Sequence, residues 1–174
     1  STFAGPTYLG GTEVYINAKG DLVLDGGNIS ILLIANATGS ITQNSSYINV
    51  SGNSELTAGG AIKLDNPQNI LVGSIDASGT DITLVNNGPL ILDTITATGT
   101  LTGSGSGIIQ TGPITAQTGL ATFNAGAGDI LLGGNNALSS VDARLAMPGP
   151  RVVNSRWRFS TMSRLMSSSG RSFQ

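Results

Sequence analysis

The sequence contains neither cysteine nor histidine. Without cysteine the chain has no disulfide bond and no thiol nucleophile, and without both residue types it lacks the commonest zinc ligands. Histidine is also the usual general base near neutral pH. Carboxylates, hydroxyls and arginines are the groups left for chemistry, so we predict that the protein is not an enzyme and holds no metal or cofactor.

Aromatic and charged residues are also scarce, at 5% and 10% of the chain. The 25 glycines, together with many serines, threonines and asparagines, suit a fold made of thin strands and tight turns. No run of 18 apolar residues is present, so we expect no insertion into a membrane. Composition therefore indicates a narrow aliphatic interior.

A short phrase returns six times at nearly constant spacing. Each copy has an alanine two residues after an apolar or small residue, with a glycine two or three residues behind it. The alanines are Ala18, Ala37, Ala58, Ala77, Ala97 and Ala116, and the glycines are Gly20, Gly39, Gly60, Gly79, Gly99 and Gly119. Because residues two apart on a strand share a face and glycine permits a sharp bend, each copy is expected to be a strand followed by a corner. The alanines and glycines should then form structural ladders.

Two further apolar pairs keep the same period. One follows the corner, as in Leu22 and Leu24, and the other precedes the next copy, as in Ile29 and Ile31. A unit of three short strands cannot bury its own apolar face and must stack on its neighbours. We therefore predict an all-β fold, a parallel β-helix (β-solenoid) of six to seven turns with about 20 residues per turn. Leucine-rich repeats share this length, but the apolar spacing of a helix is missing.

A ladder of acidic residues on neighbouring turns would indicate cleavage of a polysaccharide. With the alanines in register, Asp76 is followed at equivalent positions by Thr96 and Thr115. We therefore expect no acidic ladder and solvated surface acids instead.

Asparagines at turns form a second polar pattern. Asn66, Asn86 and Asn87 lie beside proline or glycine, and stacked amides of this kind can form hydrogen-bonded ladders. We predict a structural role for them.

Four Asn-x-Ser/Thr triplets, at Asn28, Asn36, Asn44 and Asn49, are expected from composition alone.

Charge divides the chain near residue 143. All ten acidic residues and both lysines lie between residues 13 and 142, a net charge of −8, whereas all six arginines lie beyond, a net charge of +6. We place a β-helix repeat domain at residues 1–137 and an Arg/Ser/Met-rich tail at residues 138–174. Because the whole chain is acidic and shows no basic face with stacking aromatics, nucleic-acid binding is not expected.

The tail has lost the 20-residue period. Phe159, Met162, Leu165 and Met166 fall at helical spacing, which predicts a short amphipathic helix over about residues 156–167. Three interpretations stay open: a cap on the solenoid, an arm that contacts the acidic body of a neighbouring copy, or sequence foreign to the repeats. The residues available for an inter-subunit contact are Arg151, Arg156, Trp157, Arg158, Phe159 and Arg164.

Residues 69–123 carry a family resemblance. The phrases GTDITLVNNGPLIL (residues 79–92) and TITATGTLT (residues 94–102) are its most typical parts. Over about residues 12–137 the chain resembles the repeats of filamentous-haemagglutinin-type exoproteins, large adhesins that Gram-negative bacteria export by two-partner secretion. The resemblance implies a right-handed β-helix, an extracellular or cell-surface location and an outer-membrane export partner, and it brings no catalytic residues.

We therefore expect an extracellular structural or adhesive β-helix, either a segment of an exported adhesin or a subunit that stacks end to end into a surface fibre. Open ends of a solenoid expose strand edges, so self-association is the expected partnership. A receptor, such as a host or surface glycan or protein, is also expected. The alternative is a carbohydrate-binding or polysaccharide-cleaving β-helix, for which the repeats offer few aromatic residues, such as Tyr8, Tyr15 and Tyr47.

Overall fold

The computed structural model describes residues 5–145, 152–154 and 157–159, and these residues form strands and turns without a helix. The strands are β1 (Thr7–Ala18), β2 (Leu22–Ala37), β3 (Ile41–Gln43), β4 (Ile48–Val50), β5 (Asn53–Ala58), β6 (Ile62–Leu64), β7 (Ile70–Leu71), β8 (Ile75–Gly79), β9 (Ile82–Val85), β10 (Leu90–Ala97), β11 (Leu101–Ser104), β12 (Ile108–Gln110), β13 (Ile114–Asn124), β14 (Ile130–Leu132), β15 (Asn136–Arg144), β16 (Val152–Asn154) and β17 (Trp157–Phe159). None of the described residues belongs to a helix that could cross a membrane.

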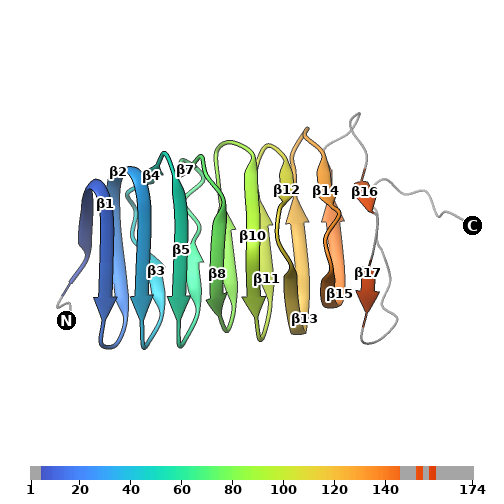
Figure 1. The fold of residues 1–174 in the computed structure, drawn as a ribbon, viewed down its shortest axis with the longest axis horizontal. Helices are drawn as coiled ribbons and strands as arrows, with labels where there is room; N and C mark the ends of the chain where they lie inside the picture. Colours follow the sequence, from blue (N-terminus) through green and yellow to red (C-terminus); the bar gives the residue numbers. More distant parts are fainter. Residues whose placement is uncertain (1–4, 146–151, 155–156, 160–174) are drawn as a thin grey trace, which may run out of the picture.

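The strands wind into a parallel β-solenoid of about seven turns with a spacing of about 20 residues, which confirms the predicted fold class (Figure 1). All recorded strand pairings are parallel, and they join each strand to its counterpart one turn away. Long strands such as β2 bend at the corners and contribute to more than one face. The coil therefore has three faces, each a column of paired strand segments.

We name the faces by these segments. Face 1 holds the predicted alanine column and runs through residues 14–18, 33–37, 54–58, 75–79, 95–97, 114–116 and 136–138. Face 2 runs through residues 22–24, 41–43, 62–64, 82–85, 101–104, 121–124 and 141–144. Face 3 runs through residues 27–29, 48–50, 70–71, 90–92, 108–110 and 130–132.

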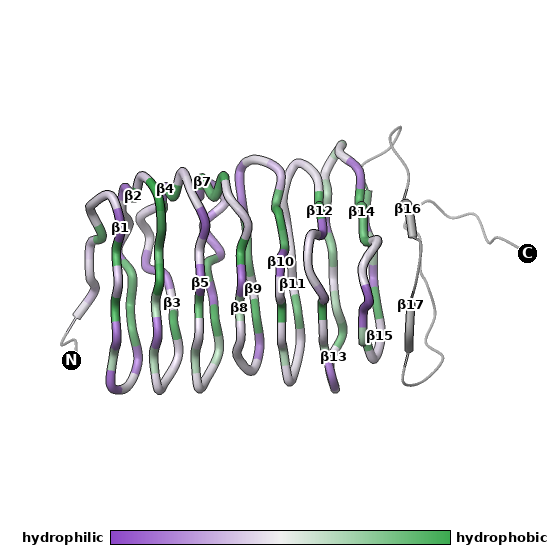
Figure 2. The backbone as a smooth tube through the Cα atoms, viewed as in Figure 1, coloured by the Kyte–Doolittle hydropathy of each residue, from purple (hydrophilic) through white to green (hydrophobic). Residues whose placement is uncertain are grey.

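The interior consists of aliphatic side chains from all three faces. Strand residues alternate between inside and outside, so that Leu22 and Leu24 are fully buried while Val23 between them is not. Figure 2 shows apolar stretches that recur along the strands of successive turns. Phe123 is the largest fully buried side chain, and its Cα partners in the neighbouring turns are the small residues Gly103 and Ala143. Large and small residues thus alternate along this column, as close packing requires.

Ser54 is a polar exception within the aliphatic interior. It is 1% exposed and stands in register between Leu33 and Ile75, and its backbone N–H donates to the carbonyl of Ser74. The hydroxyl group has no hydrogen-bond partner within the described part of the chain. A buried hydroxyl without a partner costs free energy, so this position is not optimal for stability.

We predict that Ser54→Ala raises the free energy of unfolding by about 0.5–1 kcal/mol, because alanine fits the space and needs no hydrogen bond. Urea denaturation followed by circular dichroism would measure the change. The exposed residue Thr57 on the same strand provides the control Thr57→Ala, for which we expect a change within about 0.5 kcal/mol. A loss of stability in Ser54→Ala would contradict the prediction.

Strand β15 crosses residue 137, where the sequence analysis placed the end of the repeat domain. Beyond it, β16 pairs with β14 and β17 pairs with β15. Repeat-type strand pairing therefore extends past the predicted boundary and into the segment named as the tail.

Candidate functional site

The predicted alanine ladder exists, with one displaced member. Ala18, Ala37 and Ala58 are Cα partners in successive turns, and Ala97 pairs with Ala116. The ladder lies inside face 1, where all these alanines are buried.

In the fourth turn the residue pairing differs from the prediction. Ala77 pairs with Leu56 and Ile95, and Gly79 pairs with Ala97 in the place expected for an alanine. In the next turn, a β-bulge between Leu92 and Ile95 adds one residue to β10 relative to β8. The prediction for Ala77 was therefore wrong by two residues, because the length differences between turns fall inside strands as well as in corners.

Four of the six predicted corner glycines follow Gly20 in one column. Backbone hydrogen bonds run from Gly39 to Gly20, from Gly60 to Gly39 and from Gly119 to Gly99, while Thr80 takes the place predicted for Gly79. Only Gly20 of the six has a positive φ, of 106°. The sharp-bend argument therefore holds for Gly20 alone.

At the other corner glycines the neighbouring turn leaves no space for a Cβ atom. A Cβ on Gly119 would lie 2.6 Å from the backbone of Gly99, and one on Gly60 would lie 2.5 Å from the Ser40 hydroxyl. At the same corner, the carboxylate of Asp81 accepts hydrogen bonds from the Thr100 N–H and hydroxyl, which lower the pKa of Asp81. The corner is thus held by close stacking and side-chain capping between turns.

Buried amide side chains are a feature that the sequence analysis missed. The amides of Gln43 and Asn69 bond each other reciprocally, at 2.6 and 2.9 Å, and those of Gln110 and Asn136 do the same, at 2.6 and 3.1 Å. Asn69 and Asn136 are almost fully buried, and each also accepts a backbone N–H from a strand. The signal that could have found them is their recurrence, because both members of the second pair lie 67 residues after the first.

The three asparagines predicted to stack do not form one ladder. Asn86 is buried and bonds backbone groups, whereas Asn66 donates to the Ser45 carbonyl and Asn87 is exposed. Amide ladders occur on the outer surface instead, where Asn36 donates to Asn17 and Asn49 donates to Asn28. Three of the four Asn-x-Ser/Thr asparagines, namely Asn28, Asn36 and Asn49, thus make side-chain hydrogen bonds between turns.

Two carboxylates of neighbouring turns meet in register on face 1, which is a pair and not a ladder. Glu55 and Asp76 are Cα partners on neighbouring turns of face 1, and Tyr15 stands two turns before Glu55 in the same outward column. A hydrogen bond to Glu13 and the negative charges of Glu13 and Glu55 raise the pKa of Tyr15. Among the described residues no group of three or more acidic residues could hold a metal ion. Within the described part of the chain, this short column is where carboxylates of adjacent turns meet in register.

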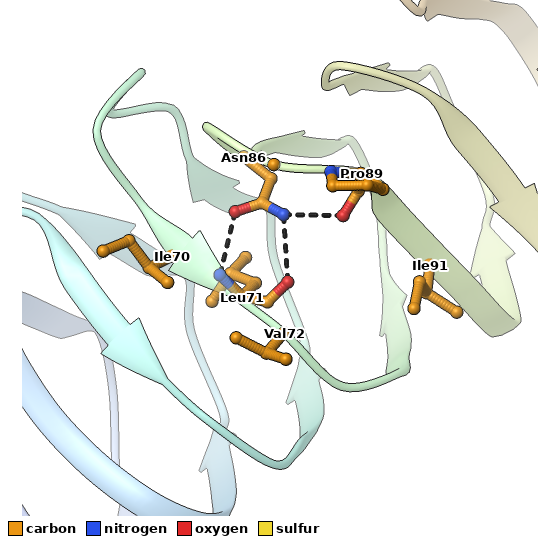
Figure 3. Close-up of a pocket in the computed structure, with 7 residues that line it drawn as sticks. Ile70, Leu71, Val72, Asn86, Pro89 and Ile91 are labelled. Carbon is orange, nitrogen blue, oxygen red and sulfur yellow. Dashed lines mark hydrogen bonds between the residues drawn. The ribbon is translucent and has the colours of Figure 1, made fainter. Parts of the chain in front are cut away.

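A shallow crevice interrupts face 3. Strands β7 and β10 have no recorded pairing, and the gap of about 250 Å³ is lined by Ile70, Leu71, Val72, Asn86, Gly88, Pro89 and Ile91. The Asn86 amide takes the place of a strand, because it accepts from the Leu71 N–H at 2.8 Å and donates to the Leu71 and Pro89 carbonyls (Figure 3). The polar atoms of the amide are thereby satisfied, and the exposed lining is mainly apolar.

The predicted helix over residues 156–167 is wrong in its described part, because Trp157, Arg158 and Phe159 form β17. Parallel pairing with Asn136–Leu138 fixes the backbone there, and it overrides the helical spacing. Arg151, Arg156 and Arg164 lie outside the described residues.

Comparison with family models matches residues 11–78 and 79–142 to Repeats of unknown function (DUF5649). The chain belongs to this family. No curated protein and no solved structure matches the chain in the corresponding searches.

A DUF5649 unit spans about three and a third turns. When Gly11-Thr12 is aligned with Gly79-Thr80, Leu22–Leu24 corresponds to Leu90–Leu92, which lies one face further on. The two amide pairs show the same displacement by one face, because Gln43 is on face 2 and Gln110 is on face 3. Two consecutive DUF5649 units are thus rotated by one face, so equivalent residues point in different directions.

Proposed function

We propose that the chain is an extracellular structural or adhesive β-helix, a segment of an exported adhesin or a subunit that stacks end to end into a surface fibre. The observation that carries this proposal is the continuous series of strand pairings along face 1, from β1 to β17. The resemblance to exported adhesin repeats supports the location and an outer-membrane export partner. The surface consists of stacked strands with one shallow crevice described on face 3, which suits adhesion or assembly better than catalysis.

Strand β1 offers a backbone edge for end-to-end stacking. Its one recorded partner in the described part of the chain is β2. The Ala18 carbonyl accepts from Thr38 in the next turn, and successive residues of a strand direct their backbone groups to opposite sides. The backbone groups of Tyr15 therefore point away from β2, toward a copy that would extend the coil.

The test is electron microscopy of the purified chain and of two variants at Tyr15. We expect filaments from the unmodified protein and from Tyr15→Ala, which keeps the edge N–H. Tyr15→Pro lacks that donor, so it should give only short isolated particles while its circular dichroism stays that of the parent. Isolated particles from the unmodified protein at high concentration would rule out self-stacking.

A second candidate, carbohydrate binding or cleavage, draws support from Tyr15, Glu55 and Asp76 on face 1. An exposed aromatic ring in the same outward column as two carboxylates is a surface that a sugar could contact. A glycan array and an assay on uronate polymers would test this candidate. The absence of both binding and cleavage would eliminate it.

A further inference from the structure

One exposed corner of the solenoid joins an asparagine to a glycine. Asn87-Gly88 is the single Asn-Gly dipeptide of the sequence. It lies in the bend between β9 and β10, where the chain passes from face 2 to face 3, and Asn87 is exposed there. Asparagine is among the chemically labile residues of proteins, and a glycine that follows it has no Cβ atom to crowd its backbone nitrogen. The dipeptide therefore combines a labile amide with an accessible nitrogen.

The fold engages neither of these two groups. Within the described part of the chain the Asn87 side-chain amide forms no hydrogen bond, and no protein group accepts from the Gly88 N–H. A Cβ atom built on Gly88 would meet only the Asn86 Nδ2 atom, at 3.6 Å, so the neighbouring turns leave room around this residue. The amide of residue 87 and the nitrogen of residue 88 are thus both available for reaction with each other.

Other asparagines lack one of these conditions. Many amides form hydrogen bonds within the fold, namely those of Asn28, Asn36, Asn49, Asn69, Asn86 and Asn136. Asn66 lies at the same corner one turn earlier, but Pro67 follows it, and a proline nitrogen carries no hydrogen. Asn44 is exposed, but Ser45 follows it and carries a Cβ atom. The exposed and unbonded amide coincides with a following glycine at Asn87.

We propose that Asn87 is a site of spontaneous deamidation to aspartate and isoaspartate. The Gly88 nitrogen attacks the Asn87 Cγ atom and loses its proton, and the side-chain nitrogen leaves as ammonia, which closes a cyclic imide. One water molecule then opens the imide. Opening at Cγ gives aspartate, and opening at the main-chain carbonyl carbon gives isoaspartate, in which the main chain runs through Cγ. The reaction needs no enzyme, oxidant or reductant, and it does not depend on the function proposed above.

Isoaspartate lengthens the main chain at a corner that is fixed on both sides. The Asn87 N–H donates to the Asn69 carbonyl at 2.8 Å, and the Gly88 carbonyl accepts from the Ser106 N–H at 3.0 Å. The neighbouring Asn86 amide is bonded to backbone groups at the same corner (Figure 3). One additional main-chain carbon within residue 87 displaces these groups relative to each other. The modification therefore loosens the fourth turn from both of its neighbours as the protein ages.

Mass spectrometry of the full chain during storage in mildly alkaline buffer tests the reaction. Cleavage before aspartate releases residues 81–92, in which the asparagines are Asn86 and Asn87. We expect the mass change from amide to carboxyl at Asn87, several-fold faster than at Asn44. The rate should rise with pH, because the attacking nitrogen must lose its proton. A change at Asn86 in place of Asn87, or no change at either residue, would overturn the proposal.

Gly88→Ala is the matched variant for this measurement. The added Cβ atom has room, and Gly88 does not have a positive φ, so the corner keeps its conformation. We expect the variant to deamidate at residue 87 several-fold more slowly than the parent, because the methyl group crowds the attacking nitrogen. Equal rates in the parent and in Gly88→Ala would overturn the proposal.

Urea denaturation measures the effect of the modification on the fold. Fresh and aged parent protein are compared with fresh Asn87→Asp, which adds the same charge without the additional main-chain carbon. We expect the aged protein to unfold at a lower urea concentration, and Asn87→Asp to unfold at the midpoint of the fresh parent. Aged protein with modified Asn87 but an unchanged midpoint would overturn the loosening of the turn. An equally lowered midpoint in Asn87→Asp would overturn it too, because charge alone would then account for the effect.

Discussion

Gly52→Ala is expected to lower the free energy of unfolding by about 3 kcal/mol or more, since an added Cβ atom would collide with the backbone of the neighbouring turn. The collision is with the carbonyl group of Ile31, and no flexible side chain is available to move aside. Gly52 does not have a positive φ, so the cost comes from stacking and not from an unfavourable backbone conformation. Relief requires that two turns separate, which would weaken the neighbouring hydrogen bond from the Ser51 N–H to the Ile29 carbonyl as well.

Gly10→Ala is the matched control for this substitution. A Cβ atom on Gly10 would meet only the Tyr8 ring, at an ordinary contact distance of 3.7 Å. We expect Gly10→Ala to change stability by less than about 1 kcal/mol. Urea denaturation of both variants, followed by far-ultraviolet circular dichroism, measures the difference. Equal stabilities would show that the turns adapt to a methyl group at this corner.

The class of fold was predictable because two periods coincide in this sequence. Alternation as in Leu22 and Leu24 selects strands, and a spacing of about 20 residues selects stacking. Neither signal specifies where an extra residue is placed. The shift that brings Gly79 into the alanine column is already set in the pairing of β5 with β8, and the sequence contains no local mark of it.

The buried amides were hidden by composition. Asparagine is frequent at turns, so nothing local distinguishes buried Asn69 from exposed Asn87. The distinction depends on whether a partner from another turn, such as Gln43, reaches the same place. Comparison of the two DUF5649 units contains that information, since a recurring Gln and Asn at the same offset mark a recurring contact. The helical spacing near Phe159 was misleading for a similar reason, because backbone pairing with β15 determines the structure there.

Asn86→Ala is expected to destabilise the solenoid by about 3 kcal/mol. The substitution leaves the Leu71 N–H, the Leu71 carbonyl and the Pro89 carbonyl without the partners that the amide supplies. Each buried polar group that loses its partner costs about 1–3 kcal/mol, and water that enters the adjoining crevice recovers part of that cost. Asn87→Ala, at the exposed neighbouring residue, should change stability by no more than about 0.5 kcal/mol. Equal stability of the two variants would contradict the structural role of the Asn86 amide.

Asn86→Asp separates the loss of hydrogen bonds from the loss of side-chain volume. A carboxylate at this position would face two carbonyl oxygens, so the folded state favours the protonated acid and raises its pKa above the unfolded value of about 3.9. Relative to the parent protein, this variant should therefore be most stable below about pH 4 and should lose stability as the pH rises toward 7. Asn86→Ala has no such group, and its deficit relative to the parent should stay constant over the same range. Unfolding curves at several pH values would show whether the deficit of Asn86→Asp grows with pH, and a constant deficit would mean that the two carbonyl groups do not sense the charge.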